Sequence, residues 1–298
     1  MSYPPRVLLA LCLTTILGLA SNISAQSPNR LIDKEMKPLL EDLEKQVKKF
    51  QDTAKDKLKD TTLNTGSGDA SVKQLVADLR DAAKRLKDEF GDGSTAAIVE
   101  DLFRRAGYVN RFMEVNPLVT GADQQWSTVK GSLDRLAAAY GITWGNEGCS
   151  GRPARLSDKQ LEQQLDTFKK SGKQYADNLD KALAKDPSID KKMRENVRNS
   201  LKNLTDMAGK LKDKLKDPEK KAEVNRLVEE ILRSGSAINN FIEMRNPPAA
   251  VKQGWAILCG QLGTVARSYN VHWPDKKETP APAAAAAPVA PPVQAAIF

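Results

Sequence analysis

The sequence contains a long internal duplication. Six residues between positions 112 and 144 recur 129 residues later: Phe112, Glu114, Trp126, Leu133, Tyr140 and Trp144 match Phe241, Glu243, Trp255, Leu262, Tyr269 and Trp273. Before Val72 the offset becomes 125, where Leu31, Asp33 and Lys34 match Leu156, Asp158 and Lys159. Each copy spans about 115 residues, a usual size for one hydrophobic core. The repeat therefore predicts two tandem domains rather than a solenoid of short repeats.

Apolar residues within each copy fall at helical spacing. The first stripe alternates intervals of four and three residues, and comprises Met36, Leu40, Leu43, Val47, Phe50, Ala54 and Leu58. Similar stripes at 72–90, 98–113 and 122–140 indicate four helices per copy, and their short connections favour antiparallel neighbours. We therefore expect an all-α fold, a tandem duplication of an up-and-down four-helix bundle, without strands.

The two ends of the chain differ in composition from the repeats. Arg6 precedes an apolar run at 7–20 that leads to Ile23-Ser24-Ala25, which predicts a signal peptide cleaved after Ala25. This run is short for a bilayer span of roughly 20 residues, and an uncleaved anchor is the alternative. The Pro- and Ala-rich C-terminus predicts a disordered tail. The expected organisation is a signal peptide (1–25), repeat 1 (26–146), a linker (147–155), repeat 2 (156–274) and the tail (275–298).

Cleavage would leave an exported protein, secreted or periplasmic, without a transmembrane span. Only two of its three cysteines, Cys149 and Cys259, would then remain. An even number of cysteines in an oxidising compartment allows a disulfide. The alternative is two unpaired thiols, with Cys259 packed as a small hydrophobe.

Charge is shared unevenly between the copies. Residues 30–144 contain 19 basic and 19 acidic side chains, whereas residues 155–273 contain 23 and 16. Most of the excess gathers on one stretch: Lys191, Lys192, Arg194, Arg198, Lys202, Lys210, Lys212, Lys214 and Lys216. A basic face of this kind favours an anionic partner, such as an envelope polymer, lipid headgroups or an acidic protein. The alternative is an ordinary solvated helix face. Lipid binding would also need apolar contact, and we expect the bundle core to occupy the apolar stripe.

Several classes of function find no support in the sequence. The basic stretch lacks interleaved aromatic residues and no nucleic-acid-binding motif is present, so no nucleic acid is expected as a partner. His272 is the only histidine, which removes histidine-based triads and paired-histidine zinc sites. No glycine-rich phosphate loop or haem-attachment motif is found. We predict no catalytic residues, no metal and no cofactor.

One polar set occurs in both copies. Asn110, Glu114 and Gln124 match Asn239, Glu243 and Gln253. The simpler interpretation is a network that fixes the turn between the third and fourth helices. The alternative is a pair of ligand pockets, floored by Phe112 and Trp126 in one copy and by Phe241 and Trp255 in the other. Gly131 and Gly260 also coincide inside the fourth helices, which predicts close approach of a neighbouring helix or ring.

Together these observations predict an exported, non-enzymatic binding or scaffolding protein that meets an anionic partner through its basic second repeat. The alternative is a carrier that holds a small apolar or amphipathic ligand within the bundles. A polyanion would dissociate with added salt, whereas a buried apolar ligand would not.

Overall fold

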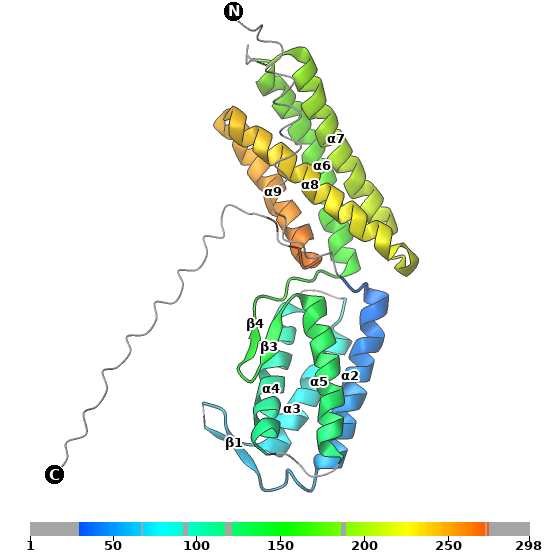
Figure 1. Ribbon diagram of the computed structural model, residues 1–298, viewed down its shortest axis with the longest axis vertical. Helices are drawn as coiled ribbons and strands as arrows, with labels where there is room; N and C mark the ends of the chain where they lie inside the picture. Colours follow the sequence, from blue (N-terminus) through cyan, green and yellow to red (C-terminus); the bar gives the residue numbers. More distant parts are fainter. Residues whose placement is uncertain are drawn as a thin grey trace, which may run out of the picture.

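A computed structural model describes residues 30–66, 68–91, 95–116, 121–185, 189–271 and 273. Eight α-helices make up most of this part of the chain, which confirms the all-α class (Figure 1). The N-terminal half (30–150) contains α2 (Asp33–Ala54), α3 (Val72–Asp88), α4 (Ala96–Val115) and α5 (Ala122–Tyr140). The C-terminal half (155–273) contains α6 (Asp158–Leu183), α7 (Lys191–Lys214), the short 3-10 helix η1 (Pro218–Lys220), α8 (Lys221–Arg245) and α9 (Ala249–Ser268). The predicted signal peptide and tail, and His272, lie outside the described residues.

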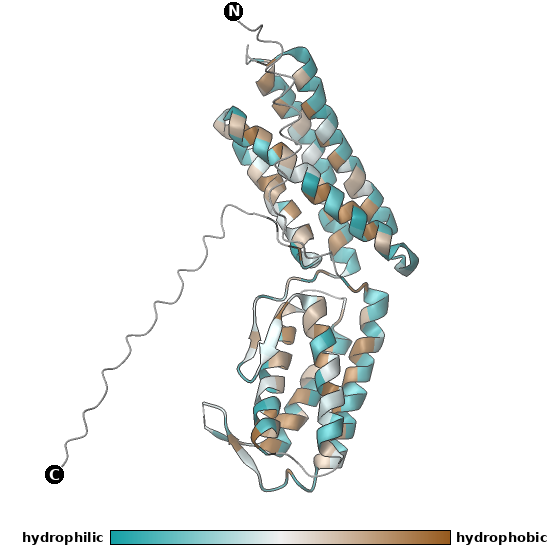
Figure 2. Ribbon diagram, viewed as in Figure 1, coloured by the Kyte–Doolittle hydropathy of each residue, from teal (hydrophilic) through white to brown (hydrophobic). Residues whose placement is uncertain are grey.

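Each half has its own hydrophobic core. Within a half, every helix packs against the next one along the chain, and the first also packs against the last. The core of the N-terminal half includes Met36, Phe50, Leu79, Phe103 and Trp126, and that of the C-terminal half includes Leu161, Phe168, Leu204, Ile231 and Trp255. Apolar and polar residues intermingle along each helix, as expected when only one side is buried (Figure 2). The two cores lie end to end along the long axis of the molecule.

Two short β-hairpins in the N-terminal half show that the prediction of no strands was wrong. In the first, β1 (Thr62–Asn64) pairs antiparallel with β2 (Asp69–Ser71), and in the second, β3 (Thr143–Gly145) pairs with β4 (Gly148–Ser150). Strands of three residues are too short to produce a recognisable alternation of polar and apolar residues. The strand β4 occupies positions that the sequence assigned to the linker 147–155, so the N-terminal half continues to residue 150.

Glycines allow close packing, but not where the sequence suggested. A Cβ atom at Gly107 of α4 would lie 2.7 Å from the Gly145 carbonyl oxygen and the Gly148 nitrogen, so this glycine lets the second hairpin approach the helix. At Gly131 and Gly260 a Cβ atom would meet no atom within 4 Å. The expectation of close approach at these two positions was therefore wrong.

Among the described ranges, no helix combines the length and the apolar character needed to span a bilayer.

Candidate functional site

The repeated polar residues form a hydrogen-bonded network in the N-terminal half. The indole Nε1 of Trp126 donates to Asn110 Oδ1 at 3.2 Å, and Asn110 Nδ2 donates to Glu114 Oε1 at 3.0 Å. Asn146, in the turn between β3 and β4, accepts a second bond from Asn110 Nδ2 at 2.7 Å and donates to Glu114. The network therefore joins α4, α5 and the second hairpin.

The C-terminal half repeats the centre of this network. Trp255 Nε1 donates to Asn239 Oδ1 at 2.9 Å, and Asn239 Nδ2 donates to Glu243 Oε1 at 2.9 Å. The sulfur of Cys259 also lies 3.8 Å from Asn239 Oδ1. The same three residue types thus make the same contacts in both halves.

The remaining residues of the proposed ligand pockets differ in burial. Gln124 and Gln253 are exposed. Phe112 is buried, and Phe241 is partly buried against the core. Each tryptophan also packs on an aromatic ring of the first helix of its half, at centroid distances of 5.3 Å for Phe50–Trp126 and 5.7 Å for Tyr175–Trp255. These contacts support the interpretation that the network fixes a turn and a helix pair.

The predicted basic face divides into two parts along α7 and the turn after it. Towards the C-terminus, three lysines pair with carboxylates of neighbouring helices: Lys212 with Asp166 at 2.6 Å, Lys214 with Glu223 at 3.0 Å and Lys216 with Glu162 at 2.9 Å. These lysines tie α7 and the turn that follows it to α6 and α8. Their charge is therefore compensated within the protein.

The other part of the face lies towards the N-terminus of α7 and keeps its charge. Lys192, Arg198 and Lys202 are exposed, as is Lys210 further along, and Arg194 is partly exposed. Within the described ranges, none of these five side chains has a carboxylate at ion-pair distance. Lys191 has only a long, exposed contact of 3.8 Å with Glu195. This part of α7 is the uncompensated section of the basic face.

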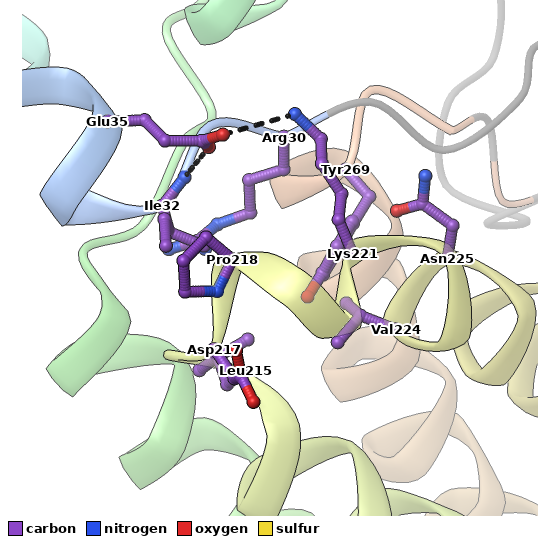
Figure 3. Close-up of a pocket in the computed structure, with 10 residues that line it drawn as sticks. All are labelled: Arg30, Ile32, Glu35, Leu215, Asp217, Pro218, Lys221, Val224, Asn225 and Tyr269. Carbon is purple, nitrogen blue, oxygen red and sulfur yellow. Dashed lines mark hydrogen bonds and ion pairs between the residues drawn. The ribbon is translucent and has the colours of Figure 1, made fainter.

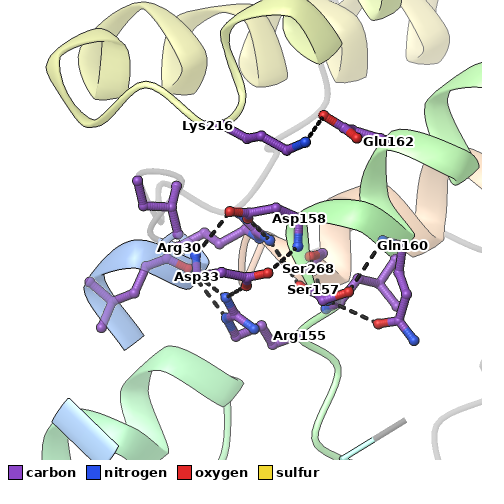
Figure 4. Close-up of polar contacts among 12 residues, drawn as sticks. Arg30, Asp33, Arg155, Ser157, Asp158, Gln160, Glu162, Lys216 and Ser268 are labelled. Atoms are coloured by element: carbon purple, nitrogen blue, oxygen red, sulfur yellow. Dashed lines mark hydrogen bonds and ion pairs between the residues drawn. The ribbon is translucent and has the colours of Figure 1, made fainter. Parts of the chain in front are cut away.

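The junction between the halves is a reciprocal clasp made by the two copies of one short motif (Figure 4). Arg30-Leu31-Ile32-Asp33 in the first copy corresponds to Arg155-Leu156-Ser157-Asp158 in the second. The backbone N–H of Asp33 donates to Asp158 Oδ2, and that of Asp158 donates to Asp33 Oδ2, both at 3.0 Å. Each copy of the motif therefore binds the other in the same way.

The arginines of the clasp complete this symmetry. Arg30 Nη2 donates to the Leu156 carbonyl at 2.8 Å and pairs with Asp158 Oδ1 at 2.6 Å. Arg155 donates to the Leu31 carbonyl at 3.0 Å and pairs with Asp33. Exchange of the same contacts in both directions is the signature of a two-fold, isologous interface.

The clasp is buried, which makes its charges interdependent. The side chains of Arg30 and Asp158 are 1% and 8% exposed. Burial, together with the nearby Arg30, lowers the pKa of Arg155. Burial also raises the pKa of Tyr269, over which Arg30 lies, to about 12. The arginines and aspartates of the clasp therefore neutralise each other, with little screening by solvent.

A pocket opens beside the clasp (Figure 3). Both halves line it, and the residues are Arg30, Ile32, Glu35, Leu215, Asp217, Pro218, Lys221, Val224, Asn225 and Tyr269. Its empty volume, which includes open solvent, is about 280 Å³. The enclosed part is only about 10 Å³, which is room for about one water molecule and far below the volume of pockets that hold small molecules. Lys221 Nζ lies 3.6 Å from Glu35 and forms part of its wall.

The sequence left open whether Cys149 and Cys259 form a disulfide or pack separately as core residues. Cys149 lies on β4 and packs against the N-terminal core, whereas Cys259 lies on α9 and packs against the C-terminal core. No bond joins the two sulfurs in the structure. Each cysteine belongs to its own half, which agrees with the alternative of Cys259 as a small core residue.

In the ranges that the structure describes, no three His, Cys, Asp or Glu side chains gather in a way that could hold a metal ion. Comparisons of the chain with protein-family models, curated proteins and solved structures find no match.

Proposed function

We propose that this is an exported, non-enzymatic binding or scaffolding protein whose C-terminal half engages an anionic partner. The observation that carries the proposal is the division of the basic face. Helix α7 uses Lys212 and Lys214 to pair with its neighbours, yet leaves Arg194, Arg198 and Lys202 without a carboxylate partner among the described residues. Those three cations are available to an external anion.

The spacing of these cations supports the proposal. They lie four residues apart, so they share one face of the helix, where like charges repel and destabilise it by a few tenths of a kcal/mol per pair. A partner with negative charge would relieve that repulsion. The clasp supports a scaffolding role, because buried reciprocal ion pairs hold the two halves in one relative orientation.

The carrier alternative has less support. The asparagine and tryptophan side chains proposed to line its pockets bond to each other. The pocket at the clasp lies elsewhere and is small.

Retention on an immobilised polyanion, eluted with a salt gradient, tests the proposed function. The variant Arg194→Gln/Arg198→Gln/Lys202→Gln should elute at a clearly lower salt concentration, since three fewer cations meet the matrix. A control with the same charge change, Lys45→Gln/Lys48→Gln/Lys49→Gln on α2, should elute with the parent. An equal loss of retention in both variants would show that retention depends only on net charge, and would contradict a specific basic site.

Export is tested separately by the mass of the protein recovered from cells. Removal of residues 1–25 is expected, and an intact N-terminus on a protein retained in the cytoplasm would contradict export.

A further inference from the structure

The two halves differ at one pair of equivalent segments. Val72 and Leu201 correspond at the offset of 129 residues, so the ten residues that precede each of them, 62–71 and 191–200, occupy the same place in the two copies. The first segment forms the hairpin β1–β2, whose Leu63 and Ala70 pack against the N-terminal core. The second segment instead forms the first ten residues of α7. The same position in the repeat is thus a cover over the core in one half and a helical extension in the other.

This extension leaves apolar side chains accessible. None of residues 191–200 is buried, and Met193 and Val197 are only partly covered by the core. Arg245 Nη2, at the end of α8, lies 3.5 Å from the sulfur of Met193. The neighbouring Met244 is 60% exposed. The end of α8, which contacts the start of α7 through Arg245, therefore carries another exposed apolar side chain.

Apolar and cationic residues run in parallel along α7. Arg194 and Arg198 each follow an apolar residue of the stripe directly, so a row of cations flanks Met193 and Val197. Residues 190–202 contain five basic and two acidic side chains, whereas the corresponding 61–73 contain one of each. We call this amphipathic surface of Met193, Val197, Met244, Arg194, Arg198 and Lys202 the distal surface.

We infer that the distal surface binds the headgroup region of a membrane that contains anionic lipids. This inference rests on the proposed function, because it names the anionic partner of the same basic site. A dissolved polyanion would contact only the cations, whereas a lipid interface also takes up apolar side chains that stand beside them. The sequence suggested that the core would occupy the apolar residues of α7, but those of its first ten residues remain partly exposed and no opening of the helices is needed.

Other occupants match the surface less well. Residues 274–298 carry two acidic and two basic side chains, so they bring no net negative charge to the cations. The distal surface of a second copy would bring like charges together. A lipid headgroup region provides both the negative charge and the apolar contact that the surface lacks.

Sedimentation of the full chain with lipid vesicles tests the inference. The vesicles contain either phosphatidylcholine alone or equal parts of phosphatidylcholine and phosphatidylglycerol, and binding is expected only to the second. One cation near an anionic surface changes the affinity about fivefold, so Arg194→Gln/Arg198→Gln/Lys202→Gln should weaken binding about 100-fold. The control Lys45→Gln/Lys48→Gln/Lys49→Gln should bind as the parent does.

A second pair of variants tests the apolar contact. Met193→Ser/Met244→Ser should weaken vesicle binding several-fold and leave retention on an immobilised polyanion unchanged. Its control is Val115→Ser, since Val115 is equivalent to Met244 in the repeat and is 69% exposed. Circular dichroism of each variant establishes that it is folded.

The possible outcomes separate the inference from the proposed function. If the cation variant loses retention on the polyanion but the methionine variant binds vesicles as the parent does, the anionic partner stands and the lipid inference is overturned. If the parent binds neither vesicles nor the polyanion, both are overturned. Binding to phosphatidylcholine alone with equal affinity would also contradict the inference.

Discussion

Replacement of one carboxylate in the clasp should destabilise the protein strongly. Asp158 is 8% exposed, pairs with Arg30 at 2.6 Å and accepts the backbone N–H of Asp33 through its other oxygen at 3.0 Å. The side-chain amide of Asp158→Asn has nearly the same shape as the carboxylate, but its NH2 group must face either the Arg30 guanidinium or the Asp33 backbone N–H, both of which are themselves donors. The variant therefore loses a charge and an acceptor, and leaves the buried Arg30 guanidinium without its counter-charge.

Removing one partner of a buried pair costs about 3–5 kcal/mol. With a urea m-value of about 2–3 kcal/mol/M, the unfolding midpoint should fall by about 1–2.5 M. Since the clasp joins halves with separate cores, the two halves should also begin to unfold separately, which hydrogen exchange followed by mass spectrometry can resolve peptide by peptide.

The matched control is the same chemical change at an exposed pair. The side chains of Arg85 and Glu89 are 62% and 51% exposed, and Glu89→Gln should not change the midpoint measurably. The double variant Asp33→Asn/Asp158→Asn should lose less stability than the sum of the two single changes, because the residues share one network. If Asp158→Asn destabilises no more than Glu89→Gln, the argument that the clasp holds the halves together is refuted.

Three further predictions concern single sites. Gly131→Ala should stabilise the protein by about 0.5–1 kcal/mol, because this helical position has space for a methyl group. Gly107→Ala should destabilise the protein by about 1–3 kcal/mol, because the added methyl group would clash with the second hairpin. Thermal unfolding that shows both changes with the same sign would contradict this prediction. Burial and the nearby Glu100 raise the pKa of the Cys149 thiol, so iodoacetamide at pH 8 should alkylate this thiol more slowly in the folded than in the unfolded protein. Equal alkylation rates in the two states would refute the raised pKa. The hydrogen bond from Lys87 lowers the pKa of Glu44 in the folded protein. The stabilising contribution of Glu44 is therefore fully present above its ordinary pKa of 4.5 and is lost as the pH falls through the lower pKa of the folded state. Urea unfolding at several pH values should show a smaller acid-induced loss of stability in Glu44→Gln than in the parent.

The helices could be predicted from the sequence because a core-facing stripe repeats every three or four residues over many turns. The stripe from Met36 to Leu58 lies on α2 and continues just beyond its end, and its members are all buried. The hairpins could not be predicted in this way, because three residues carry no periodic signal. Gly66 and Gly68, both with positive φ, were the available indication of a turn between β1 and β2.

Some residues of the candidate sites could likewise be predicted from the sequence, and others could not. The polar set around Asn110 and Asn239 was found because internal identity selects residues that both copies retain. The match of Asp33 with Asp158 was also visible, but identity between two motifs does not reveal that they bind each other. The pairing of Lys212, Lys214 and Lys216 could not be predicted, since their partners lie on other helices and depend on how these pack.

The reciprocal clasp also bears on how the two ends of the molecule came to differ. Two separate copies of one subunit that meet through an isologous interface must share every change, because one gene encodes both. In a single chain that contains both copies, the two partners of the interface are always present in a one-to-one ratio. Each copy can then change its sequence independently of the other. One copy could then retain a hairpin and a neutral surface, while the other acquired a longer, basic helix at the same position.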